Sequence, residues 1–212
     1  MICNDLKKTI IKNKNDKDSA KIVADLLKQG KICILPTDTV YGFSGIVDLK
    51  NQISYKTDDL IRKIKGRAEN KAFIQLIAKP SDLKIYTDDK IPEKILEKWP
   101  GPLTIIVNTK KNSPLAQNFP TVAFRCPGDE WLRNIVQECK SPLYSTSVNR
   151  SGKEVLNEIS KIKDEFASEV SLIVDDGDKK NALPSTIIRI EKDESGNSAI
   201  KILRQGAVKI EI

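Results

Sequence analysis

Polar and basic residues gather in short clusters along this chain, and most of these clusters follow apolar stretches. The clusters are residues 36–42 (PTDTVYG), 65–67 (KGR), 145–152 (STSVNRSG), 184–187 (PSTI) and 203–206 (LRQG). Arginine can hold a carboxylate or phosphate in a planar fork, and lysine, hydroxyl and amide groups add further hydrogen bonds to oxygen. The chemistry that these side chains suit is the binding of anions. Each cluster alone is also compatible with an ordinary turn or a solvated surface.

Two cations, Lys65 and Arg67, flank Gly66, and Lys71 follows closely. If the backbone is extended there, residues at positions i and i+2 can converge on one phosphate, and glycine allows a close approach. The segment lacks the spacing of a P-loop. A solvated basic turn is the alternative.

In the third cluster, Ser145, Ser147 and Asn149 occupy alternate positions, so their side chains share a face if the backbone is extended. Such a face would hydrogen-bond hydroxyls, a carboxylate or a triphosphate, and the alternative is a loop that caps the next helix. Thr121 and Arg125 likewise share a face of an expected strand, where Arg125 could hold a carboxylate.

Hydroxyls of the first cluster, Thr37 among them, come directly after a buried apolar run. Ligands of open α/β sheets bind beyond the carboxyl ends of the strands, so these hydroxyls could face a substrate. The alternative is a turn in which threonine and aspartate side chains bind their own backbone.

Histidine is absent from the 212 residues, which excludes Ser-His-Asp and Cys-His triads and histidine metal sites. The formal net charge is +7, supplied mostly by scattered lysines, while there are seven arginines. Four cysteines without a C-x-x-C pair indicate free, buried thiols in a cytoplasmic protein. No secretory signal and no membrane span are expected.

Apolar periodicity then predicts the elements that must position these clusters. Helices are expected at residues 19–29, 60–65, 93–98, 131–136 and 159–166, and strands at 31–35, 73–77, 103–108, 121–125, 172–174, 186–190 and 200–203. Residues 143–145 lead into a polar loop. The interleaving predicts one α/β domain over residues 1–212, with a core at about 16–208 and a mixed sheet covered by helices.

The clusters, with residues 99–104 (WPGPLT) and 122–127 (VAFRCP) between them, resemble in order and spacing the YrdC/Sua5 family of threonylcarbamoyl-AMP synthases. The match runs from about Ala20 to Gly206. The family's K-x-R signature falls at Lys65 and Arg67, and its S-x-N signature at Ser147 and Asn149. The resemblance implies a twisted mixed sheet around a cationic cavity, without the C-terminal domain of the longer Sua5 form.

The activity implied by this resemblance is a nucleotidyl transfer. L-threonine, bicarbonate (or CO2) and ATP give L-threonylcarbamoyladenylate and pyrophosphate, for the t6A modification of adenosine 37 in tRNA. Mg2+ would come with the ATP, and no dedicated protein metal site is expected. Partners would be these small molecules, downstream transfer proteins and tRNA, with no membrane.

The site residues that the resemblance implies fall into four groups. Catalytic residues would be Lys65, Arg67, Ser147 and Asn149. ATP would be held by these four with Thr121 and Arg204, and L-threonine by Thr37, Arg125, Ser145 and Ser185. Tyr41 and Lys71 would form cavity walls. Replacing Lys65 or Arg67 by alanine is expected to abolish turnover without changing the fold.

Departures from the family pattern are Ala68 after K-x-R, Ala72-Phe73 shortly after, Val148 inside S-x-N, and the absence of histidine. The changes at residues 68, 72–73 and 148 remove no charged or hydrogen-bonding group. Any contact that a histidine makes near the amino-acid pocket of relatives must be replaced or absent here. The alternative function is a non-catalytic protein that binds tRNA or duplex RNA, with a steep salt dependence. Only 5% of residues are aromatic, which disfavours base stacking. A related carbamoyl-adenylating module is a third reading, disfavoured because zinc-finger and acylphosphatase-like segments are missing.

Overall fold

One twisted mixed sheet organises the molecule, and the apolar runs of the sequence make most of its strands. The structure, a computed structural model, describes residues 9–50, 53–54, 56–66, 72–115, 119–192 and 198–210. The strands of this part are β1 (Ile10–Asn13), β2 (Cys33–Leu35), β3 (Gly42–Ile46), β4 (Ile74–Leu76), β5 (Leu103–Asn108), β6 (Thr121–Arg125), β7 (Leu143–Ser147), β8 (Leu172–Asp175), β9 (Thr186–Lys192) and β10 (Ser198–Arg204).

The strand order across the sheet is β1-β8-β2-β3-β7-β4-β6-β5-β9-β10. Strand β8 runs parallel to β1 and β2, β4 parallel to β6, and β5 parallel to β9. The other neighbours are antiparallel. This arrangement confirms the expected mixed sheet in an α/β fold.

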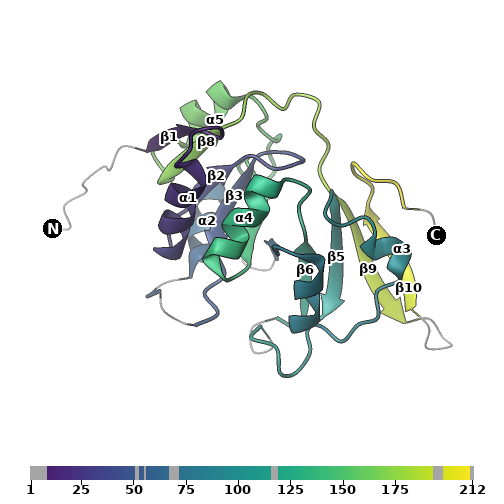
Figure 1. Cartoon of the computed structure of the whole chain (residues 1–212). Coiled ribbons are helices and arrows are strands. Elements are labelled where there is room, and N and C mark those ends of the chain that lie inside the picture. The colour runs from purple at the N-terminus through teal and green to yellow at the C-terminus, as the bar shows by residue number, and fades with distance from the viewer. Residues whose placement is uncertain are drawn as a thin grey trace.

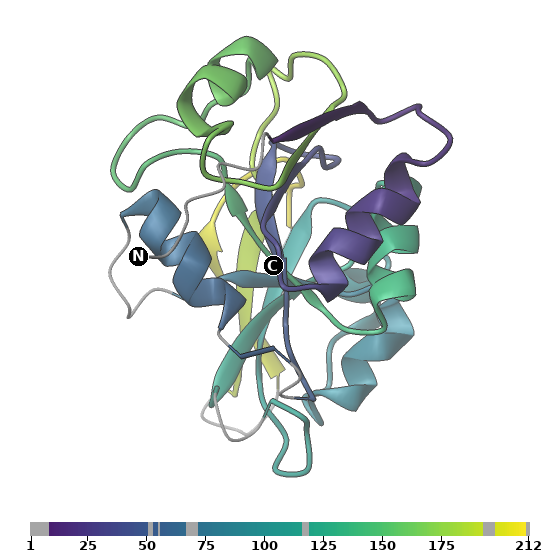
Figure 2. The ribbon, with the colours of Figure 1, turned by 90° about the vertical axis from the view of Figure 1, so that its left-hand side faces the viewer.

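Helices cover both faces of the sheet because each carries an apolar stripe. They are α1 (Ser19–Lys28), α2 (Thr57–Lys65), α3 (Glu93–Leu96), α4 (Glu130–Cys139) and α5 (Ile159–Phe166), with a 3-10 helix η1 (Pro80–Ile85). Figure 2 shows α1 and α4 side by side on one face and α2 on the other. One apolar cluster contains Leu27 and Leu132 under α1 and α4, and a second contains Phe43 and Phe166.

Strand β3 was not predicted, because its sequence Gly-Phe-Ser-Gly-Ile carries two glycines and a serine. Glycine weakens an isolated strand, but close packing requires it here. A Cβ on Gly45 would lie 2.9 Å from Cδ1 of Ile32 and 3.1 Å from Cβ of Thr57. Strand β1 was also missed, since it is a short edge strand of mixed polarity whose Ile10 and Ile11 are exposed.

The polar clusters are brought together where several strand ends meet. Gly42 at the start of β3 pairs with Ser147 at the end of β7, and Ser145 pairs with Ile74 of β4. The connection from β8 to β9 then runs from one half of the molecule to the other (Figure 1). Segments far apart in the sequence therefore share one region of the molecule.

Three thiols, those of Cys33, Cys126 and Cys139, are free and buried, as expected; Cys3 lies outside the described residues. Burial raises the pKa of Cys126 to about 12 and that of Cys139 to about 12, so both thiols stay protonated near neutral pH. In the described ranges, no helix is long and apolar enough to span a bilayer.

Candidate active site

A cavity of about 230 Å3 lies among the strand ends just described. Its walls come from the segment before β3, the start of β4, the end of β6, the end of β7 and the segments beside β9 and β10. Seven of the predicted site residues line it, namely Thr37, Tyr41, Arg125, Ser145, Ser147, Ser185 and Arg204. The structure therefore gathers most of the motif residues, from five separate clusters, around one hollow.

Five predicted site residues are not among the described residues that line this cavity. Thr121 lies at a separate, shallow depression with Asp58 and Gln75. Lys65 and Asn149 contact each other instead of lining this cavity. Arg67 and Lys71, like Ala68, fall outside the described residues. The roles implied for all of these residues stay predictions.

Arg125, which is 4% exposed, is held rigidly at the end of β6. Its Nε donates to the carbonyl of Gly101 at 3.2 Å, its Nη1 to Oγ1 of Thr39 at 2.8 Å, and its Nη2 to Oδ1 of Asp38 at 2.5 Å. Asp38 is fixed in turn by the N–H of Gly128, 2.9 Å from its other oxygen. Since a guanidinium has five N–H groups, this shell leaves one N–H on each terminal nitrogen without a partner among the described residues.

Thr37 takes part in a directed chain of hydrogen bonds that begins at Arg125. Oγ1 of Thr37 donates to the carbonyl of Val40 at 2.8 Å, so the 2.9 Å contact between the two threonine hydroxyls has Thr39 as donor. Thr37 also accepts from the N–H of Thr39 at 3.0 Å. The turn therefore binds its own backbone, as the alternative predicted, while its two threonines also line the cavity.

Arg204 and Ser185 form another part of the cavity wall. Arg204 is the last residue of β10, and Ser185 directly precedes β9. The guanidinium of Arg204 donates to the carbonyl of Ser185 at 2.8 Å and 3.1 Å and to its hydroxyl at 3.2 Å. Ser185 also contacts the hydroxyl of Thr104 at 2.8 Å. Burial and, after it, the positive charge of Arg125 lower the pKa of Arg204. The two guanidiniums thus act on one another, which favours an anion between them.

Ser145 and Ser147 point to the cavity from β7, as their alternation predicted. Ser147 donates to Oδ1 of Asn149 at 2.8 Å, whereas the hydroxyl of Ser145 has no partner within the described ranges. A Cβ on Gly42 would lie 3.0 Å from Oγ of Ser145. Glycine in the paired strand therefore leaves room for this hydroxyl.

The expected convergence of Ser145, Ser147 and Asn149 on one face is wrong for Asn149, because β7 ends at Ser147. Asn149 turns back: its amide nitrogen donates to the carbonyls of Arg150 at 2.9 Å and Lys153 at 2.7 Å. The helix that Asn149 was alternatively expected to cap begins only at Ile159. Asn149 instead orders the turn that follows β7.

Lys65 is 3% exposed and its ammonium lies under this same turn. Nζ donates to the carbonyls of Ser147 at 2.6 Å and Asn149 at 2.9 Å, and to Oδ1 of Asn149 at 2.9 Å. These acceptors match the three N–H donors of an ammonium group. Removing Lys65 would therefore also release the turn after β7, a local change beyond the loss of turnover expected for Lys65→Ala.

Convergence of Lys65 and Arg67 on one phosphate was conditional on an extended backbone around Gly66, and Gly66 is not extended. It ends α2 as a left-handed C-cap, with φ 60° and ψ 41°. Glycine adopts this region at little cost, and its N–H donates back to the carbonyl of Lys63 at 3.2 Å. Lys65 therefore lies in the last turn of α2, in agreement with the helix expected at residues 60–65.

Tyr41 lines the cavity, and its hydroxyl group forms hydrogen bonds with two backbone groups. It donates to the carbonyl of Gly177 and accepts from the N–H of Asp176, both at 2.8 Å. Burial raises the pKa of Tyr41 to about 12. Tyr41 thereby fastens the β8–β9 connection to the segment before β3.

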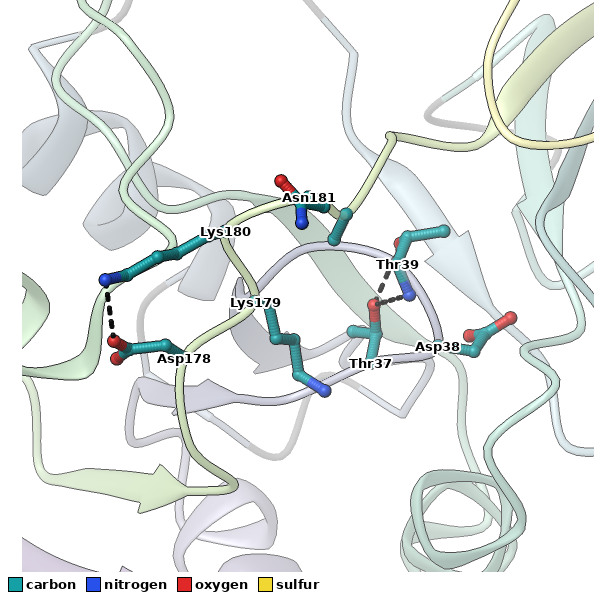
Figure 3. Close-up of a pocket in the computed structure, with 8 residues that line it drawn as sticks. Thr37, Asp38, Thr39, Asp178, Lys179, Lys180 and Asn181 are labelled. Carbon is teal, nitrogen blue, oxygen red and sulfur yellow. Dashed lines mark hydrogen bonds and ion pairs between the residues drawn. The ribbon is translucent and has the colours of Figure 1, made fainter.

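A second, open hollow of about 500 Å3 adjoins the cavity, and Thr37 and Thr39 line both. Figure 3 shows the side chain of Lys179 reaching from the β8–β9 connection toward these threonines. Nζ of Lys179 lies 3.0 Å from the carboxylate of Asp176 and 5.8 Å from the centre of the Tyr41 ring. Together the two hollows give the site more volume than the cavity alone.

The residues that sequence reasoning missed are Asp38, Thr39 and Thr104, which support the predicted ones. All three stand inside the quoted motifs, but no role was assigned to them. The signal was Arg125 itself, because an arginine in an apolar strand needs a carboxylate or several acceptors nearby. Among the described residues, no group of three or more cysteines and carboxylates could hold a metal ion.

Comparison with known proteins matches this site to one family. The model of Sua5, YciO and YrdC proteins, described as telomere recombination, matches residues 25–206. A relative from Methanocaldococcus jannaschii is 33% identical over 97% of both chains. A threonylcarbamoyl-AMP synthase from Pseudoalteromonas translucida is 31% identical over 82% of this chain and 94% of its own.

Among solved structures, Sua5 from P. abyssi complexed with L-threonine superposes with a TM-score of 0.76 at 26% identity. The similarity covers 93% of this chain but 57% of that Sua5 chain. Fold, motif order and the three comparisons therefore agree, and this chain belongs to the Sua5/YciO/YrdC family.

Proposed function

We propose that this protein is a threonylcarbamoyl-AMP synthase, a nucleotidyltransferase that contributes to the t6A modification of tRNA. The observation that carries this function is the cavity, which seven residues from five separate motifs line together. Relatives that bear this name support it, because two of them match 82% and 71% of this chain. The alternative of a plain RNA-binding protein has no support among these relatives.

Arg125 would bind the carboxylate of L-threonine. Its N–H groups toward Asp38, Thr39 and Gly101 are already used, and one N–H on each terminal nitrogen can still donate. Because the guanidinium is oriented before the ligand arrives, little conformational entropy is lost on binding. The unpartnered hydroxyl of Ser145 and the hydroxyls of Thr37 and Ser185 line the rest of this pocket.

The chemistry then needs charge stabilisation more than a strong base. The amine of L-threonine combines with CO2 or bicarbonate to form a carbamate, whose oxygen attacks the α-phosphate of ATP. The bond to the β-phosphate breaks and pyrophosphate leaves. Two anions approach each other in this step, so a fixed cation such as Arg204 lowers the barrier, typically by about 3 kcal/mol per preorganised contact.

The nucleotide would lie toward Arg204, Ser147 and the Lys65–Asn149 pair, with Arg67, Lys71 and Thr121 as further expected contacts. The cavity lining offers hydroxyls and guanidiniums, and the nearby carboxylate of Asp38 has both oxygens engaged. This donor set does not fit a protein-held metal ion. We therefore expect Mg2+ to be coordinated by the phosphate oxygens of ATP itself. Transfer proteins that consume the adenylate, and tRNA in the cytoplasm, would complete the reaction sequence.

An omission series tests the function. ATP is incubated with the protein alone, then with L-threonine, then with L-threonine and bicarbonate, while pyrophosphate and the adenylate are followed by mass spectrometry. We expect both products only in the complete mixture. Pyrophosphate release that is independent of threonine, or no release in the complete mixture, would contradict the proposal.

The variant Arg125→Lys tests the threonine pocket in the same assay. A lysine replaces the two-pronged contact by one, and a hydrogen bond to a charged group contributes about 1.5–3 kcal/mol. The KM for L-threonine should therefore rise roughly 10–100-fold, while the KM for ATP changes little. Arg189→Lys is the matched control, because Arg189 pairs with Glu191 on β9 and is not part of the cavity lining. An unchanged KM for threonine in Arg125→Lys would contradict the assigned role.

A further inference from the structure

Arg150 follows Asn149 directly in the chain, and no role has been assigned to it. It lies outside the cavity, yet its guanidinium makes four contacts. Nε donates to Glu165 at 2.7 Å, Nη1 to the carbonyl of Ile64 at 2.5 Å and to Glu169 at 3.2 Å, and Nη2 to the other oxygen of Glu169. These two carboxylates raise the pKa of Arg150, which stays charged. Arg150 thus connects the turn after β7 to α5 and to the end of α2.

Two aromatic rings join Arg150 to Lys65 through the core. The guanidinium carbon of Arg150 lies 4.6 Å from the centre of the Phe166 ring. Phe166 meets Phe43 edge to face, with ring centres 4.9 Å apart, and Nζ of Lys65 lies 5.3 Å from the centre of Phe43. Each cation therefore stacks on one ring of the pair, and both rings are fully buried.

The backbone closes the same unit. The N–H of Ser151 donates to the carbonyl of Lys65 at 2.7 Å, and the N–H of Leu156 donates to the carbonyl of Val148 at 2.8 Å. Lys65 reaches back to the carbonyls of Ser147 and Asn149. The end of α2 and the turn after β7 are therefore tied together from both sides, and Arg150 is the side chain that ties them to α5.

We infer that Arg150 is a positioning residue, which sets the places of Lys65 and Asn149 without touching a substrate. This inference rests on the proposed function, because it assigns Lys65 and Asn149 to the nucleotide end of the site. Threonine binding, by contrast, depends on Arg125, which is held by Asp38 and Thr39 and shares no contact with Arg150. Loss of Arg150 should hence act on the chemical step more than on threonine binding.

Three variants test this inference: Arg150→Ala, Arg150→Lys and the control Lys161→Ala. Lys161 lies on the same helix α5 and pairs with Glu158 at 2.5 Å, so the control also removes one ion pair from that helix. In Arg150→Ala we expect kcat to fall about tenfold and the KM for L-threonine to change less than twofold. Arg150→Lys should recover part of the rate, because lysine keeps one ion pair but not the fork. Lys161→Ala should behave as the wild type.

Hydrogen exchange supplies a readout that does not depend on turnover. The amides of Ser151 and Leu156 should exchange at least several-fold faster in Arg150→Ala than in the wild type, and Lys161→Ala should leave them protected. If Arg150→Ala does not fold, Glu165→Gln removes one carboxylate partner and should give a smaller change in the same direction. Unchanged exchange and unchanged kcat in folded variants would overturn the inference.

Failure of the inference can be told from failure of the proposed function. A wild-type protein that makes no adenylate refutes the function, while the exchange of Ser151 and Leu156 still reports whether Arg150 orders the turn. An active wild type with a fully active, equally protected Arg150→Ala refutes the positioning role alone. A fall in thermal stability matched by Lys161→Ala, without the kcat effect, would also refute it.

Discussion

At the scale of single residues, a chain of neutral hydroxyl groups helps to hold the guanidinium of Arg125 in place. Arg125 donates to Thr39, Thr39 to Thr37, and Thr37 to a backbone carbonyl. Each oxygen in this chain has a fixed donor, so the orientation of the guanidinium does not depend on solvent. Fixed orientation is what makes an arginine an efficient carboxylate receptor, because the geometry is ready before binding.

Tyr41 allows a prediction about pH at this scale. Its hydroxyl contacts two backbone groups, and Tyr41→Phe would leave a buried N–H and a buried carbonyl without that partner, at a cost of about 1–3 kcal/mol at pH 7. Burial raises the pKa of Tyr41 from 10.0 to about 12, so folding favours the neutral phenol. The stability that this provides is complete below pH 10 and is lost as pH rises from 10 to 12.

Urea unfolding at pH 7 and pH 11 measures this effect. The stability gap between the wild type and Tyr41→Phe should narrow at pH 11, because the variant has no phenol to ionise. Tyr86→Phe is a matched control, since burial also raises the pKa of Tyr86 to about 12 while its hydroxyl has no bond within the described residues. It should show little loss at pH 7. A gap for Tyr41→Phe that is constant or wider at pH 11 would contradict the assignment.

At the scale of elements, strand β3 contributes to the wall of the cavity through Gly42. It lies between β2 and β7 and contains no polar residue except Ser44, and its Gly42 leaves room for the hydroxyl of Ser145 on β7. Gly42 stands opposite Ser147 and beside the hydroxyl of Ser145. The same strand therefore supplies packing through Gly45 and space for a hydroxyl that lines the cavity through Gly42.

Gly42→Ala tests this element. The new Cβ would lie 3.0 Å from Oγ of Ser145, so the hydroxyl must move, and overpacking of this kind costs about 1–3 kcal/mol. Thermal melting should show the loss, and the KM for L-threonine should rise. The double variant with Ser145→Ala removes the clashing oxygen and should recover most of the stability. Full stability and activity of Gly42→Ala would show that the close approach is unimportant.

At the scale of the whole molecule, the sheet is continuous from β1 to β10. One half contains β1, β8, β2 and β3, the other contains β5, β9 and β10, and the site lies where the two halves meet. Strands β7, β4 and β6 carry hydrogen bonds from one half to the other. The larger apolar cluster contains Phe43 from one half and Ile188 from the other. The two halves should therefore unfold together, and the cavity between them should not open independently.

The two tryptophans report on this cooperativity separately. Trp131 is on α4 and donates to Ser19 of α1 at 3.2 Å, whereas Trp99 precedes β5 and donates to the carbonyl of Leu103 at 2.6 Å. In Trp99→Phe and in Trp131→Phe, urea unfolding followed by fluorescence should coincide with unfolding followed by far-UV circular dichroism. A fluorescence transition that precedes the loss of helix and sheet in one variant would show that the halves unfold separately.

Much of the fold was predictable, because helix and strand periodicity is a local property of the chain. The expected strands at residues 103–108 and 121–125 coincide with β5 and β6, and the expected helix at 159–166 with α5. Strand β3 was not predictable in this way, since only its contacts with Ile32, Thr57 and Ser145 explain its glycines. The condition of an extended backbone around Gly66 is not met for a related reason: a glycine is equally suited to ending a helix, and Gly66 ends α2.

The amino-acid sequence alone determined the family, the kinds of groups available and the order of the motifs, because these depend on residue identity and spacing. Only the tertiary structure decided which groups share a cavity and which are already engaged. Thr37, Arg125, Ser145 and Arg204 face one hollow, while Lys65 and Asn149 bind each other. That difference follows from strand register and from the competition of backbone carbonyls for every buried donor, neither of which can be read from a motif.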